Sequence, residues 1–170
     1  SYLTPQALID LVAQGHGEWR SAHLEGLDLS KAELPGARLR FAGLRGCNLR
    51  GARLTGATLT MANLEMVDLS GADLELADLR GARVGKHTRM VGTNLTGANL
   101  RKASLASVHA PGARFVSASL RGVDFELADL STADFSDADL RKANLHVANL
   151  RGADLTGANL ARANLDGVYL

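Results

Sequence analysis

Apolar residues recur at every fifth position through most of the chain. The pattern is clearest over residues 138–170, where centres such as Leu140 and Leu145 follow one another. A small residue, usually Ala, lies two positions before each centre, and Asp or Asn lies between them. A period of five would spread these apolar residues around an α-helix, and it does not match the two-residue period of a strand. It predicts short extended segments, with the centre and the small residue facing inward, joined by corners.

Glycine supports the corners. Fourteen of the 18 glycines lie two positions after a centre. This is the third position of a four-residue turn, where a type II turn needs a positive φ. Corners that carry Phe41, Met61, Leu76, Leu127 or Lys142 at this position are expected to adopt another turn type.

The register of the repeats predicts four-sided coils. The frame runs through 13 repeats from Leu24 to Val84, then restarts at Met90, one residue late, for 17 more repeats to Leu170. Residues bulkier than Ala at the small position lie 20, 20, 21 and 20 residues apart: Leu27, Cys47, Val67, Thr88 and Val108. Four five-residue sides therefore form one coil, and 30 repeats make about 7.5 coils. The extra residue at 85–88 is expected to form a bulge.

Residues 1–21 do not repeat and predict a short capping helix. Thr4 is a suitable N-cap, and Gly15 or Gly17 is expected to end the helix. Trp19 follows. The apolar face of this helix, with Trp19, is expected to cover the first open edge of the coils.

Here the sequence resembles the pentapeptide-repeat family, whose motif is A-(D/N)-L-x-x. Repeats 62–64 and 72–74 carry the motif verbatim, and the resemblance covers residues 22–170. It implies an all-β solenoid of the right-handed quadrilateral β-helix type as a single domain. The lead-in at 14–20 is similar to that of bacterial, particularly cyanobacterial, members.

The composition of the chain limits its possible core, binding partners and cellular compartment. Hydrophobic residues make up 46% of the chain but aromatic residues only 4%, which suits a narrow Leu and Ala interior. The formal charge is +1, so net charge favours neither nucleic acid nor an acidic partner. A single cysteine, Cys47, excludes an internal disulfide framework. No apolar run is long enough for a membrane span. No signal peptide is visible, which favours the cytoplasm, although the chain begins at Ser1 without Met.

Charge is distributed in stripes along the predicted faces. One face carries Arg38 and, beyond it, eight cations that we call the basic stripe: Arg40, Arg80, Arg101, Lys102, Arg121, Arg141, Lys142 and Arg162. Two acidic residues, Asp78 and Asp139, lie on the same face and partly offset the positive charge of the basic stripe. The adjoining faces carry acidic residues: Glu25, Glu65, Glu126 and Asp166 on one, and Glu33, Asp73, Glu75, Asp134 and Asp137 on the other. The basic stripe suits an acidic protein surface or an anionic polymer, but a solvated face that keeps the rods soluble would have the same character.

Other polar and reactive residues favour structural roles. Asp and Asn before the centres suit local turn hydrogen bonds better than a metal ladder. The histidines lack ligand spacing, and Cys47 is interpreted as a core filler rather than a nucleophile. Phe115 and Phe135 are placed on one face and Phe125 opposite, with Ala110 compensating for their size.

Two irregular places are further candidates for contact. The frame slip brings together Lys86, His87 and Arg89 as a candidate binding loop. The last repeat ends at Tyr169 and Leu170 without a capping helix. Either the sequence is cut at this point, or the open edge is covered by a second copy in an end-to-end homodimer.

These observations predict a non-catalytic scaffold for protein–protein interaction, with no cofactor or metal. The resemblance raises a second hypothesis, protection of a topoisomerase such as gyrase by DNA mimicry, although such members are strongly acidic. Nucleic-acid binding through the basic stripe is a third hypothesis. It is not favoured, because no stacking aromatic residues accompany the arginines.

Overall fold

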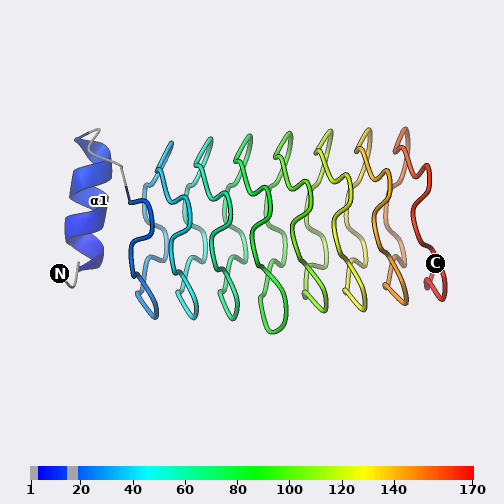
Figure 1. The fold of residues 1–170 in the computed structure, drawn as a ribbon, viewed down its shortest axis with the longest axis horizontal. Helices are drawn as coiled ribbons and strands as arrows, with labels where there is room; N and C mark the ends of the chain where they lie inside the picture. Colours follow the sequence, from blue (N-terminus) through cyan, green and yellow to red (C-terminus); the bar gives the residue numbers. More distant parts are fainter. Residues whose placement is uncertain (1–3, 15–18) are drawn as a thin grey trace.

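The computed structural model describes residues 4–14 and 19–170, and it begins with helix α1, Pro5–Ala13. The Thr4 side chain accepts a hydrogen bond from the Ala7 N–H at 3.2 Å, as an N-cap does. Leu8 and Val12 are buried, and Trp19 packs against the same core. Figure 1 shows α1 at one end of a stack of coils, with the C-terminus at the other. The predicted helix end at Gly15 or Gly17 lies outside the described residues.

Parallel β-bridges between successive coils form the body of the molecule. Each bridge joins a residue to its equivalent 20 positions later, as in His23↔Gly43. The spacing is 21 across the frame slip, as in Asp68↔Arg89, and returns to 20 afterwards. Because one residue on each side forms the bridge, residues 19–170 contain isolated bridges rather than continuous strands.

Leu and Ala fill the interior, as the repeat predicts. Centres and small positions are almost all buried from Leu24 to Leu150. Where Thr88 and Thr93 replace Ala, each hydroxyl donates to a backbone carbonyl, at 2.9 and 2.8 Å, so no buried donor is left unpaired there. Three buried aromatic rings, those of Phe115, Phe125 and Phe135, pack together among the aliphatic side chains.

The non-glycine corners share the left-handed φ of the glycine corners, and the separate turn type expected for them stays a prediction. Phe41, Met61, Leu76, Leu127 and Lys142 keep a φ of 57–59°, in the same left-handed region as the glycine corners at 61–72°. A left-handed non-glycine residue costs roughly 1–2 kcal/mol. The neighbouring coil holds it in place, since the N–H at this position donates to the coil above, for example Phe41 to the Thr60 carbonyl at 2.9 Å.

The inserted residue is accommodated at one corner. The Thr88 N–H donates to the Gly85 carbonyl at 3.2 Å, and the regular coil-to-coil bonds resume with Arg89 N–H to the Val67 carbonyl at 3.0 Å. His87 carries the positive φ at this corner. The bulge therefore pushes its extra side chain outward and leaves the interior register intact. Within the described parts of the chain, no helix has the length and apolar character to cross a bilayer.

Candidate interaction surface

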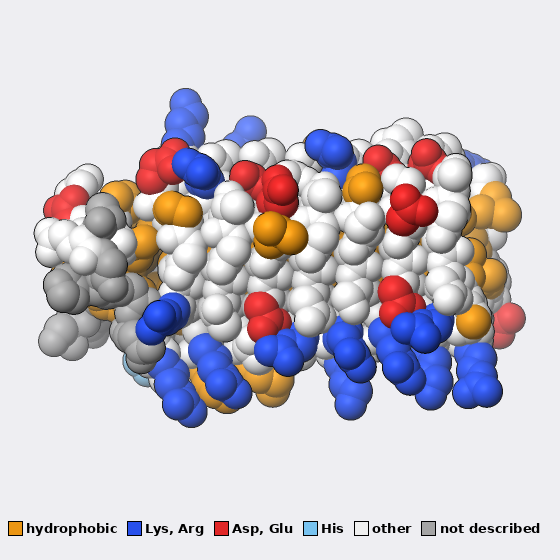
Figure 2. All heavy atoms as spheres, turned by 90° about the horizontal axis from the view of Figure 1, so that it is seen from above, with side chains coloured by type: hydrophobic (Ala, Val, Ile, Leu, Met, Phe, Trp, Pro, Cys, Tyr) orange, Lys and Arg blue, Asp and Glu red, His pale blue; other side chains and the backbone are white. Residues whose placement is uncertain are grey.

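Coil stacking gathers the basic stripe along one corner of the rod. Arg40, Arg80, Arg101, Arg121 and Arg141 occupy the same turn position in their coils. Equivalent positions in adjacent coils are separated by the β-spacing of about 4.8 Å. Figure 2 shows Lys and Arg side chains following one edge of the rod over most of its length, with acidic side chains beside them at two places. A sequence of almost balanced charge thus gathers most of the exposed cations of this stripe on one corner.

Two arginines of the stripe are held by neighbouring carboxylates. The Arg80 Nη2 lies 2.6 Å from the Asp78 Oδ2, and the Arg141 Nη2 lies 2.7 Å from the Asp139 Oδ2. The arginine hydrogen bonds are the main reason that the pKa of each aspartate lies below its usual value. These pairs are about half exposed on the arginine side, so they orient the guanidinium groups more than they stabilise the fold.

Four further cations of the stripe make no ion pair with another described residue. Across residues 4–14 and 19–170, no ion pair involves Arg101, Lys102, Lys142 or Arg162. The stripe therefore sets eight cations against two acids.

The stripe residues line two surface hollows. The first, of about 540 Å³, contains Arg40, Arg80, Arg101 and Lys102, and the second, of about 190 Å³, contains Arg121, Arg141, Lys142 and Arg162. All eight cations expected from the sequence are thus brought into two neighbouring groups. Four uncharged residues that were not expected from the sequence complete the lining: Thr60, Met61, Gly81 and Ala161. These residues stand where equivalent positions in other coils carry Lys or Arg, and this can be seen only once the 20-residue register is known.

The expectation that no aromatic residue accompanies the stripe needs correction at one end. Phe41 is 40% exposed beside Arg40. The Arg40 and Arg20 guanidinium carbons lie 5.1 and 5.5 Å from its ring centroid. Ser21 N–H donates to the Arg40 carbonyl, which places Arg20 in the same column. Two arginines already cover this ring, so it does not form the open row of stacking platforms that single-stranded nucleic acid requires.

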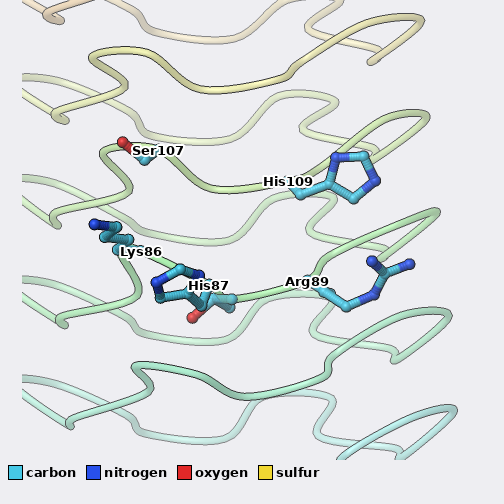
Figure 3. Close-up of a pocket in the computed structure, with 6 residues that line it drawn as sticks. Lys86, His87, Arg89, Ser107 and His109 are labelled. Atoms are coloured by element: carbon cyan, nitrogen blue, oxygen red, sulfur yellow. The ribbon is translucent and has the colours of Figure 1, made fainter.

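The frame slip forms a separate hollow of about 480 Å³. Lys86, His87 and Arg89 line it together with Ser107 and His109 from the next coil, which the sequence argument did not include. In Figure 3, Lys86 and Arg89 extend in opposite directions from the bulge, and His109 lies on the same side as Arg89. The His109 Nδ1 is 3.1 Å from the Asp129 Oδ2. The cations of this loop therefore diverge and do not converge on one bound group.

Asp and Asn residues along the sides make local hydrogen bonds. Asp28 Oδ1, for example, accepts from the Ser30 N–H at 3.1 Å, and Asn94 Nδ2 bridges to Asp73 Oδ1 in the preceding coil at 3.0 Å. In the described residues, no three His, Cys, Asp or Glu side chains are grouped so that they could hold a metal ion. The ladder thus has a structural explanation.

Cys47 lies inside the solenoid. Its Sγ donates to the Leu24 carbonyl at 2.9 Å, and burial raises the pKa of the thiol. A protonated, enclosed thiol is a poor nucleophile at neutral pH.

The final coil exposes apolar side chains. Leu170 is 85% exposed and Tyr169 is 51% exposed, and the Arg151 guanidinium carbon lies 5.8 Å from the Tyr169 ring centroid. Both residues of the predicted edge contact are thus on the surface of this coil.

The parallel 20-residue register, the Leu and Ala interior and the repeated corners together define a four-sided β-solenoid. The chain belongs to the pentapeptide repeat family. The family model "Pentapeptide repeats" matches eight copies, over residues 20–51, 47–84, 86–115, 111–147 and 133–170. The fold is accordingly a right-handed quadrilateral β-helix. Proteins of this family are generally non-catalytic structural or interaction scaffolds.

Solved pentapeptide-repeat structures resemble the chain to different degrees. Rfr23, from the cyanobacterium Cyanothece 51142, is 25% identical with a TM-score of 0.52, and the match covers 54% of this chain and 63% of Rfr23. The chain thus spans less than two thirds of that protein. HetL, from the cyanobacterium Nostoc sp. strain PCC 7120, is involved in heterocyst differentiation regulation. It is 29% identical over 98% of this chain and 96% of its own, with a TM-score of 0.42.

A third solved structure is that of QnrB1, a plasmid-mediated fluoroquinolone resistance protein. It is 21% identical over 84% of this chain and 79% of its own, with a TM-score of 0.37. No curated protein matches the sequence.

Proposed function

We propose that the protein is a non-catalytic scaffold whose basic stripe binds an acidic surface of a protein partner. The rod, of about 7.5 coils by its 30 repeats, holds the cations at fixed spacing on a backbone that needs no ordering on binding. The observation that carries the proposal is that eight cations line two adjacent hollows on one corner of a chain whose formal charge is only +1. Such a surface favours rapid, salt-sensitive association with a complementary acidic face.

The experiment compares two charge-neutralised variants. The stripe variant changes Arg101, Lys102, Arg121 and Lys142 to Ala, and the control variant makes the same change at four exposed cations outside the stripe: Lys31, Arg45, Arg50 and Arg114. Both lose the same charge. Binding of a labelled Glu-rich polypeptide is measured by fluorescence anisotropy at low and at physiological ionic strength.

The stripe variant should lose salt-dependent binding of the Glu-rich polypeptide, whereas the control variant should retain most of it. Equal loss in both variants would mean that binding follows net charge and not this surface, and the proposal would be overturned. A duplex DNA arm is run in parallel. Retention of duplex binding at physiological salt by the control variant, but not by the stripe variant, would assign the surface to nucleic acid instead.

DNA mimicry and gyrase protection require a continuous acidic face. The columns that the sequence assigns to acidic faces are interrupted by arginines: Arg53 is bridged between Glu33 and Asp73, and its Nη1 lies 3.5 Å from the Glu33 Oε2. Arg83 likewise pairs with Glu65 at 2.7 Å. The mixed columns favour the scaffold over the mimic. A gyrase supercoiling assay discriminates, since a mimic would inhibit the enzyme or protect it from drug.

We also propose self-association through the final coil, on the basis of the exposure of Leu165, Tyr169 and Leu170. Pairing with a second copy would cover apolar surface that water otherwise contacts. Light scattering tests this directly. A concentration-dependent dimer should form in the wild type and weaken in Leu170→Asp, and a wild-type monomer at high concentration would defeat the idea.

A further inference from the structure

The first hollow of the basic stripe lies where both cationic columns are interrupted. Thr60 occupies the turn position that is Arg in the coils before and after it, and Gly81 occupies the next position, between Met61 and Lys102. The small side chains leave a depression of about 540 Å³, bordered by Arg40, Arg80, Arg101 and Lys102. The second hollow is about 190 Å³ and is lined by four cations and Ala161. The first hollow is thus both larger and less uniformly charged.

Met61 provides the apolar surface of this hollow. Met61 is 52% exposed, and its side chain extends along the rod over Gly81, where an added Cβ would collide with the Met61 Sδ. Phe41 occupies the equivalent position in the preceding coil, but Arg20 and Arg40 cover its ring, so Met61 is the apolar side chain of the hollow. Methionine adapts its shape to varied apolar partners. A flexible apolar side chain therefore lies exposed in the middle of a cationic corner.

We propose that the first hollow of the basic stripe, which contains Met61, receives a large apolar side chain carried by an acidic, extended segment of the protein partner. The inference rests on the proposed function and adds to it the chemistry of the segment that is bound. Charge complementarity selects acidic residues on both sides of the hollow, and Met61 selects an apolar residue between them. The hollow then contributes specificity that the charges alone do not provide.

The spacing of the rod defines the pattern of that segment. Arg40 and Arg101 are three coils apart, which is about 14 Å at the β-spacing. Alternate side chains of an extended peptide point the same way and lie about 6.7 Å apart, so four residues span about 13 Å. A segment of the form acidic–x–apolar–x–acidic therefore places one carboxylate near Arg40, its apolar side chain at Met61 and the second carboxylate near Arg101 or Lys102.

The test uses two peptides of equal charge. One has Leu between two Glu residues in this spacing, and the other has Ser in place of Leu. Wild-type protein should bind the Leu peptide about tenfold more tightly, as expected when one anchoring apolar side chain is buried. The preference should persist at physiological salt, although both affinities fall, because apolar contact is not screened.

Matched variants locate the preference. Met61→Gln should abolish the preference for the Leu peptide, whereas Met66→Gln should leave that preference unchanged. Met66 is a matched control because it occupies the same position of the next corner, is 48% exposed, and has a φ of 60°, against 58° at Met61. Gly81→Ala should also abolish the preference by displacing Met61. Gly56→Ala is the control, because it has the same left-handed strain, with a φ of 66° against 64°, but no atom within 4 Å of an added Cβ.

The outcomes separate this inference from the proposed function. Equal binding of the two peptides by the wild type, or an unchanged preference in Met61→Gln, would overturn the hollow and leave charge-based binding intact. Binding of neither peptide at low ionic strength would overturn both. Thermal unfolding of each variant verifies that a lost preference does not reflect a lost fold.

Discussion

Replacing Phe125 by Leu is the most informative single test of the interior. Leu is the residue found at most centres of the repeat, so consensus reasoning expects the change to be neutral or stabilising. The structure predicts the opposite. Phe125 is fully buried, and its ring meets two others edge-on: Phe115 at 5.6 Å and 78°, and Phe135 at 6.0 Å and 80°.

The expected cost follows from these contacts. Each edge-on aromatic pair contributes about 0.5–1.5 kcal/mol beyond the area that it buries, so losing two removes about 1–3 kcal/mol. The smaller Leu side chain also leaves unfilled space beside Phe115 and Phe135, which are stacked at 4.8 Å and held by neighbouring coils. We therefore expect Phe125→Leu to destabilise the fold by about 2–3 kcal/mol, below the roughly 3–5 kcal/mol of Phe125→Ala.

Urea unfolding followed by far-UV circular dichroism and by Trp19 fluorescence measures the change. Agreement of the two probes establishes that one transition is compared in each variant. Met90→Leu is the control: it restores the consensus at a buried centre outside the aromatic cluster and should change stability by less than about 1.5 kcal/mol. A Phe125→Leu variant as stable as the wild type would refute the claim that the rings form one packed unit.

Three further outcomes are expected. The Cys47 thiol should resist labelling by a thiol reagent at neutral pH until the protein unfolds, because it is 1% exposed and its pKa is raised; rapid native labelling would contradict this. The pKa of Asp139 is lowered in the folded state, so its contribution is present above the unfolded pKa and is lost as the pH falls through the folded value. Asp139→Asn should lower the free energy of unfolding at neutral pH by well under about 1 kcal/mol and should make that free energy fall less steeply on acidification than in the wild type; equally steep falls in both proteins would refute the assignment. Changing Lys86, His87 and Arg89 to Ala should leave the melting temperature nearly unchanged, because all three side chains are exposed. The same variant should weaken binding of a partner, and unaltered binding would remove the loop as a site.

Much of the candidate surface was predictable because the repeat is so regular. Once the period was known, the eight cations of the stripe followed from counting positions, and the structure lines its two hollows with them. The neutral residues Thr60 and Gly81 carry no chemical signal of their own. They matter because of the longer side chains in adjacent coils, and no local pattern in the sequence expresses that relation.

The corners show the limit of local reasoning in another way. Propensity assigns a positive φ to glycine, and it correctly places many of the corners. It fails at Leu76 and Lys142, because the hydrogen bond from each corner to the next coil holds the backbone in the left-handed region despite its local cost. His109 likewise lines the hollow at the frame slip because of a contact between coils. It lies about 20 residues from the slip in sequence, but stacking places the two coils one β-spacing apart.

The sequence alone determined the interior, the four-sided coil and the position of the slip, because burying an apolar residue every fifth position allows few other backbone paths. Only the tertiary structure decided which exposed side chains meet. Neighbours on this surface come from successive coils, so their contacts depend on side-chain size and direction at positions 20 or 21 residues apart. Met61 over Gly81, with arginines on either side, is the clearest case: its surroundings exist only when four coils are stacked.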